Sequence, residues 1–273
     1  IDCADEETAK RIAEAVQVVV TAANQSIPLA RLDGITFASD YAAALNNLDR
    51  GFGTCTPLTP TDEKYGVGVA MAPIVLRDGV LKARIVMRGD FGHALIGEDE
   101  QTKGLAIHTL VYELAHVGCV ELVEQALPGV MLSRIEDEFD AERYACIDPA
   151  WSGYFAARAS AAFRENAGAD YLELFLAALD RALRDIPEAR LAYRFHGDVP
   201  KLFRPSLKYV SAILQHAANL IGHYDGLQKS PLDSKGKLAA ALNKVGLCAW
   251  FDAYQVDLQT LWDHRGEWKS FEE

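Results

Sequence analysis

A nearly unbroken succession of helical patterns after residue 98 constrains the fold of this 273-residue chain more than any other feature. Apolar residues recur there at three- and four-residue spacing, which is the period of one helix face. Prolines and a glycine interrupt the succession between residues 184 and 206, which makes that stretch a candidate boundary or lid. The pattern predicts a helical body made of residues 99–121, 134–147, 150–166, 169–185, 206–224, 235–248 and 250–263.

The first third of the chain has a different pattern, in which β-prone segments follow a single helix. The predicted helix covers residues 5–24, and a β-prone run follows at 34–39. Two longer β-rich runs flank the sequence RDG at 77–79, and an Asp-Gly pair favours a tight hairpin turn because glycine accepts a positive φ. We therefore expect residues 81–88 to pair antiparallel with residues 67–76.

The two patterns together predict an α+β fold, with a small mainly antiparallel sheet followed by a helical C-terminal part. We expect residues 1–148 to form the domain that contains the sheet, and residues 149–273 to form a helical subdomain. The chain has ample apolar material for such cores, since 50% of its residues are hydrophobic.

Charge and cysteine content limit the partners and the compartment. The formal net charge of −12 and the lack of a basic run argue against nucleic-acid binding, because a phosphate backbone must be met by clustered Lys and Arg. The apolar run at 15–23 is too short to span a bilayer, so we expect no membrane partner. Scattered cysteines, five in all, favour reduced thiols and a cytoplasmic protein. The start at Ile1 rather than Met leaves open the removal of a targeting segment.

The segment HTLVYELAHVGC at 108–119 differs by one letter from the zinc-binding pattern H-E-x-x-H. On a helix, Tyr112 and His116 lie one turn apart, with Glu113 beside Tyr112. His108 is roughly 12 Å from His116 along the helix axis, which is too far for both imidazoles to bind one metal ion directly. In this segment only Tyr112 and His116 can share an ion.

A metal ion that hydrolyses amides needs about three protein ligands and an open position for water, so a third donor must come from elsewhere. The segment SRIEDEFDAERYAC at 133–146 supplies carboxylates on a second predicted helix. Ala141 and Ala145 share one side of this helix with Glu138, and such small residues would allow two helices to approach closely. The candidate carboxylates are Glu136, Asp137, Glu138 and Glu142.

The region from about residue 65 to 146 resembles the zincin metallopeptidases of the glutamate-liganded branch, and in detail the ImmA/IrrE-type proteins. The matching pieces are RIVMRG, IHTLVYELAHVGC and EFDAERYA, which cover less than a third of the chain. The resemblance implies that His116 and Glu138 are zinc ligands and that Glu113 is the general base. It also implies a peptide or protein substrate that adds as a strand to the edge of the hairpin.

Tyr112 departs from the family pattern, because it stands where the family has its first histidine. A tyrosine binds a metal ion as phenolate, and its ordinary pKa of about 10 opposes deprotonation at neutral pH. We therefore expect weak zinc binding and impaired hydrolysis, whether Tyr112 is natural or an inactivating substitution. The alternative is a non-catalytic pseudopeptidase that acts as a peptide-binding, protein-binding or regulatory module, with its interface in residues 150–273.

Simpler interpretations exist for the same residues. The segment around Glu113 also fits an amphipathic core helix with a histidine at its edge, in a helical scaffold without peptidase ancestry. His216 and His223 are seven residues apart on one helix face. They could stabilise an oxyanion above the site, or they could be ordinary histidines at a packing edge.

Overall fold

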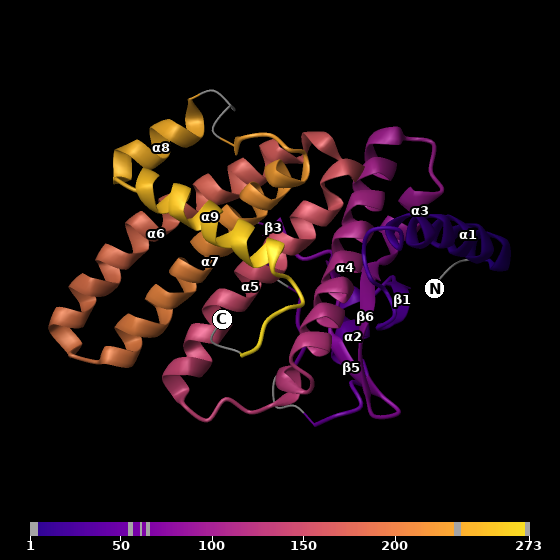
Figure 1. The fold of residues 1–273 in the computed structure, drawn as a ribbon, viewed down its shortest axis with the longest axis horizontal. Helices are drawn as coiled ribbons and strands as arrows, with labels where there is room; N and C mark the ends of the chain where they lie inside the picture. Colours follow the sequence, from indigo (N-terminus) through magenta and orange to yellow (C-terminus); the bar gives the residue numbers. More distant parts are fainter. Residues whose placement is uncertain (1–4, 54–56, 61, 64–65, 232–235, 271–273) are drawn as a thin grey trace. The chain divides into compact units, whose positions relative to one another are not determined.

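The computed structural model describes residues 5–53, 57–60, 62–63, 66–231 and 236–270. The chain divides into two compact units, each of which has its own interior. Unit 1 consists of Ile1–Met131, Ala162–Arg164 and Gly266–Glu273, and unit 2 consists of Leu132–Ala161 and Glu165–Arg265. Figure 1 follows the chain through both units by colour, from the indigo N-terminus to the yellow C-terminus.

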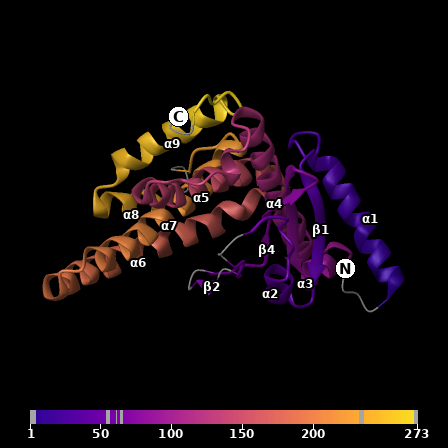
Figure 2. The same cartoon turned by 90° about the horizontal axis from the view of Figure 1, so that it is seen from below.

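Unit 1 contains the strands and confirms the predicted α+β class, with a small sheet that is mixed rather than mainly antiparallel. In the main sheet β6 (Val80–Arg88) pairs in parallel with β1 (Leu32–Ala38), and antiparallel with β4 (Ala70–Met71) and β5 (Ile74–Arg77). A separate antiparallel pair joins β2 (Asp62–Glu63) and β3 (Gly66–Val67). The helices of this unit are α1 (Glu6–Ala23), α2 (Tyr41–Asn46), α3 (Gly89–Leu95) and α4 (Glu100–Ala126). Figure 2 shows α1 beside β1.

The predicted hairpin is confirmed, with Arg77 opposite Val80. Asp78 and Gly79 have φ values of 52° and 78°, the positive angles that a two-residue hairpin turn requires. The predicted strand 67–76 is divided, however, because a break separates β4 from β5. Pro73 lies in that break, and a proline has no N–H to donate to the ladder.

Helix α4 is the central helix of unit 1, and buried residues lie all around it. It begins after Asp99, whose carboxylate accepts a hydrogen bond from the Thr102 N–H at 2.9 Å. It is the one helix among the described residues that is long and apolar enough to cross a membrane, but 67% of its most apolar window is buried inside the protein. A helix that is apolar on every side is also what a protein core requires.

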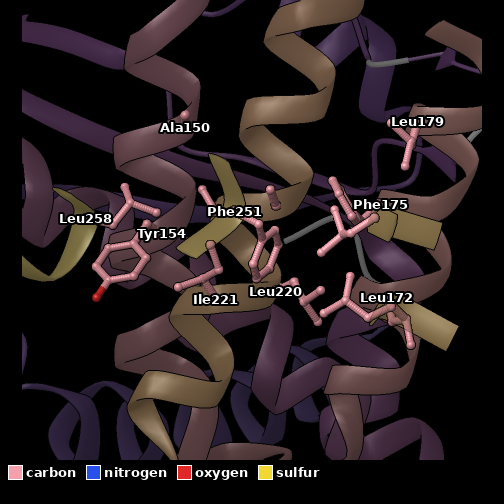
Figure 3. Packing of buried hydrophobic residues seen from close by; sticks show 13 residues of the cluster. Ala150, Tyr154, Leu172, Phe175, Leu179, Leu220, Ile221, Phe251 and Leu258 are labelled. Carbon is pink, nitrogen blue, oxygen red and sulfur yellow. The ribbon is translucent and has the colours of Figure 1, made fainter. Parts of the chain in front are cut away.

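Unit 2 is a helical body around one apolar core. Its helices are α5 (Glu138–Ser160), α6 (Gly168–His196), α7 (Val199–Gly226), α8 (Lys237–Val245) and α9 (Cys248–Asp263). Figure 3 shows the core, in which side chains from all five helices meet. The fully buried members with the largest side chains are Tyr154, Phe175, Leu220, Ile221 and Phe251.

One predicted interruption is wrong and another is shorter than predicted, because the helices continue through Pro149 and Pro187 and the break within 184–206 is confined to Gly197 and Asp198. The segments 134–147 and 150–166 are joined in α5 through Pro149, and α6 continues through Pro187. Each proline removes one backbone hydrogen bond, but packing of α5 and α6 against α7 offsets the loss. The predicted lid at 184–206 is instead the far end of an α6–α7 hairpin.

The expected domain boundary between residues 148 and 149 falls inside α5, whereas the compact units separate between Met131 and Leu132. The reason is that α5 packs along α7 over its length, so the whole helix belongs with unit 2. Cys119, Cys146 and Cys248 form no disulfide bond with one another, and Cys3 and Cys55 lie outside the described residues.

Candidate functional site

Helix α4 holds Tyr112, Glu113 and His116 as the sequence spacing predicts. The ring centroids of Tyr112 and His116 lie 5.0 Å apart with an interplanar angle of 77°, so the two side chains share one helix face. The His108 ring lies 6.5 Å from that of Tyr112. Of the candidate donors on this helix, Tyr112 and His116 are thus the adjacent pair.

Burial changes the protonation of both ionisable groups next to Tyr112. Glu113 is buried, and the loss of hydration raises the pKa of its carboxyl group to about 8. Burial also lowers the pKa of the His116 imidazole to about 4. Within the described part of the chain, neither side chain has a hydrogen bond or an ion pair. At neutral pH the imidazole is neutral, with a lone pair available for a ligand, and the carboxyl group is largely protonated.

Tyr41 of α2 is a further residue of this region that the sequence did not reveal. Its side chain is buried, and its hydroxyl group has no hydrogen-bond partner among the residues that the structure describes. Burial, and secondarily the charge of Glu113, raise the pKa of the Tyr41 phenol. Tyr41 therefore lies within electrostatic reach of Glu113. The sequence YAAAL gives no signal for this role, because it is equally typical of a short packing helix.

The sheet lies against the same helix, since α4 packs on β6 and on β4. The antiparallel pairing expected for residues 81–88 is confirmed at Ala70–Met71 and Ile74–Arg77. An edge strand beside α4 is the arrangement that strand addition of a peptide requires. Direct contact between this edge and Glu113 stays a prediction.

Glu138 belongs to unit 2, where it is the first residue of α5. Its carboxylate is exposed and accepts a hydrogen bond from Arg204 Nη2 at 2.7 Å, and Arg204 Nε donates to Glu142 at 3.2 Å. Since Tyr112, Glu113 and His116 lie in unit 1, the role of Glu138 as their third ligand stays a prediction. Within the described residues, no group of three His, Cys, Asp or Glu side chains is placed to hold a metal ion.

His216 and His223 lie on α7 of unit 2. His223 is fully buried, and its Nε2 atom is 3.1 Å from the carbonyl oxygen of Glu165. The rings of Tyr171 and Tyr224 lie 5.5 Å and 5.7 Å from that imidazole. These contacts are typical of a packed core histidine, and a role for either histidine in oxyanion stabilisation stays a prediction.

The donor chemistry fits zinc only in part. His116 supplies a neutral imidazole, which zinc prefers, but its neighbour Tyr112 supplies a phenol that must lose a proton to bind. A histidine at position 112 would instead offer a second imidazole one turn from the first. Comparison with protein-family models, with curated proteins and with solved structures finds no match for this chain.

Proposed function

We propose that this protein is a zinc-dependent metallopeptidase-type protein whose hydrolysis of peptide bonds is impaired, because Tyr112 occupies the position of a metal-binding histidine. The observation that carries the proposal is the pair of ionisable side chains on α4. Glu113 is buried, His116 is half-buried one turn later, and neither has an ion-pair partner among the described residues. Buried ionisable groups of this kind cost stability and are concentrated at functional sites.

The proposal gives each residue a distinct task. His116 and Glu138 would hold the zinc ion. The positive charge of the ion would favour the ionised form of Glu113, which would then accept a proton from water. Zinc, when bound, would polarise that water and lower its pKa. Tyr112 must lose its phenol proton before it can bind zinc, so the residues present do not fit a tightly held zinc ion. No catalytic step through zinc therefore follows for this sequence.

The alternative function is a non-catalytic pseudopeptidase that binds peptides or proteins. It is favoured by the sheet, because β4 is the last strand in the order β1-β6-β4 and no other described strand pairs with its outer edge. A peptide could add there through main-chain hydrogen bonds without any metal ion. The same edge would serve the substrate of an active relative.

Zinc content and peptide hydrolysis of matched variants test the proposal. We compare the Tyr112 protein with Tyr112→His and with the double variant Tyr112→His/Glu113→Gln. We expect substoichiometric zinc and background hydrolysis in the Tyr112 protein, and stoichiometric zinc with hydrolysis in Tyr112→His. The double variant should bind zinc but not hydrolyse peptides, because the proton acceptor is missing.

Two results would contradict the proposal. Stoichiometric zinc and strong hydrolysis in the Tyr112 protein would establish Tyr112 as a working ligand and remove the impairment. If neither the Tyr112 protein nor Tyr112→His binds zinc, the metallopeptidase assignment fails, and the non-catalytic function replaces it.

A further inference from the structure

The far end of the α6–α7 hairpin in unit 2 exposes a row of apolar side chains. Leu191 and Phe195 lie one turn apart on the same side of α6, and Leu183 lies about two turns before Leu191. Phe195 is 85% exposed and Leu191 is 55% exposed. Val199 continues the exposed apolar surface beyond the turn at Gly197. Apolar groups gathered in this way indicate a contact surface rather than a random exposure.

The same hairpin end is basic, although the chain as a whole is acidic. Residues 181–208 contain seven Lys and Arg and three Asp and Glu, a net charge of +4, which leaves −16 for the rest of the chain. Arg190 and Arg194 are exposed, and neither forms an ion pair with any described residue. The apolar row on α6 is thus bordered by positive charge that has no partner within the described chain. We call residues 190–199, which contain Arg190, Arg194 and the single carboxylate Asp198, the basic half of the surface.

An acidic half with its own exposed aromatic residue adjoins it. Residues 136–142 contain five Asp and Glu and no Lys or Arg, although Arg204 pairs with Glu138 and Glu142, and Arg143 pairs with Asp140. Phe139 in this segment is 57% exposed, and its ring stacks on Phe203 of α7 at 6.2 Å between centroids. Phe203 lies one turn after Val199 on α7, so the acidic half begins where the basic half ends.

We propose that the two halves form one self-complementary surface and that a second copy of this chain occupies it. A two-fold axis between the halves would place Phe195 and Arg194 of one copy against Phe139 and Glu136 of the other, and the reverse contact would form at the same time. The aromatic contacts would provide most of the affinity, and the opposite charges would fix the register. A polyanion fits only the basic half, since the acidic half would repel it.

Sedimentation velocity over a range of protein concentrations tests this proposal on the full chain. We expect a reversible dimer that weakens as salt is raised, because screening reduces the attraction between the halves. Phe195→Ser should weaken association by roughly tenfold or more, as truncation of a central aromatic residue does at other interfaces. The matched control is Val256→Ser, which changes an apolar side chain that is 64% exposed on α9 of the same unit. This control should leave the dimer unchanged.

A charge exchange makes the test specific for the register. Arg190→Glu/Arg194→Glu and Glu136→Arg/Asp140→Arg should each be monomeric, because like charges then face each other in the homodimer. An equal mixture of the two variants should form a heterodimer, since both contacts become complementary again. All changed positions are exposed, and circular dichroism verifies that each variant is folded.

Three results would overturn the proposal. They are a monomer at every concentration, a dimer that Phe195→Ser does not weaken, and a mixture of the charge variants that does not associate. Vesicles that contain phosphatidylserine form a further arm of the experiment. Binding of a monomer to them that Phe195→Ser abolishes would assign the surface to an anionic lipid instead of a second copy. The inference does not depend on the zinc chemistry of α4, so either can fail alone.

Discussion

Two places in the molecule, one in each unit, treat ionisable side chains in opposite ways. In unit 1, Glu113 is buried and His116 is half-buried on α4, and the described residues offer them neither an ion pair nor a hydrogen bond. In unit 2, the Arg158 guanidinium group is largely buried but has many partners. It donates to Tyr154 and to Gln259, the latter at 2.6 Å, and it lies 3.7 Å from the Asp225 carboxylate.

The partners of Arg158 are themselves satisfied. Tyr154 donates its hydroxyl proton to Asp225 at 2.8 Å, and Gln255 donates to the other oxygen of that carboxylate at 2.9 Å. The ring of Trp262 lies 4.4 Å from the Arg158 guanidinium carbon and adds a cation–π contact. The network joins α5, α7 and α9, so its evident role is to fix these helices together.

The difference separates a structural arrangement from a functional one. Burying an ionisable group without a partner costs free energy, and a fold retains that cost where the group serves another purpose. The region around Glu113 shows this signature, and the network around Arg158 does not. Substitutions should therefore have opposite consequences for stability in the two units.

The largest effect is expected for Arg158→Ala. The substitution leaves the Asp225 carboxylate largely buried without its counter-charge, which costs about 3–5 kcal/mol of unfolding free energy. Urea denaturation followed by tryptophan fluorescence measures the loss, because Trp151, Trp250 and Trp262 lie in unit 2. A loss below about 1 kcal/mol, the value of a surface pair, would show that the network is not structural. Gln259→Ala, which removes one neutral partner, is the control and should cost less.

In unit 1, substitution of Glu113 is expected to stabilise the protein rather than destabilise it, and the size of this change in unfolding free energy depends on pH. The folded protein holds the Glu113 proton more tightly than the unfolded chain does. The contribution of this bound proton to the unfolding free energy is therefore fully present below pH 4.5 and is lost as pH rises through about 8. Glu113→Gln removes the titration, so the natural protein should lose stability relative to this variant by up to about 1.4 kcal/mol per pH unit in that window.

Urea denaturation of metal-free protein at several pH values between 5 and 9 measures this difference. A constant difference between the natural protein and Glu113→Gln across the window would mean that Glu113 has an ordinary pKa. The comparison between the two units would then lose its basis, because Glu113 would have to be hydrated or paired.

The part of this structure that the sequence predicted is the part set by local geometry. The Asp78–Gly79 turn and the placement of Tyr112 and His116 on one face follow from backbone preferences and the helical period. The continuation of α6 through Pro187 was missed, because packing against α7 outweighs a local penalty.

Burial was equally invisible from the sequence. The amino-acid sequence around Tyr41 does not indicate that its hydroxyl group lies within electrostatic reach of Glu113. The partners of Arg158 come from segments far apart in the chain, so no local pattern announces them. Neither the surroundings of Glu113 nor the network around Arg158 could therefore be predicted from the sequence alone.

The smallest effects come from a matched pair of tyrosines and test the comparison most directly. Tyr41 and Tyr154 are both buried, but among the described residues only the hydroxyl group of Tyr154 has hydrogen-bond partners, Asp225 and Arg158. Tyr154→Phe removes hydrogen bonds to charged groups and should cost about 1.5–3 kcal/mol of unfolding free energy. Tyr41→Phe removes a buried hydroxyl group that has no partner among the described residues, so it should be neutral or stabilising by up to about 1 kcal/mol. Urea denaturation of both variants beside the natural protein gives the two values. If Tyr41→Phe destabilised the protein as much as Tyr154→Phe, the hydroxyl group of Tyr41 would have to be satisfied in solution, and the region around Tyr41 and Glu113 would no longer differ in kind from the network around Arg158.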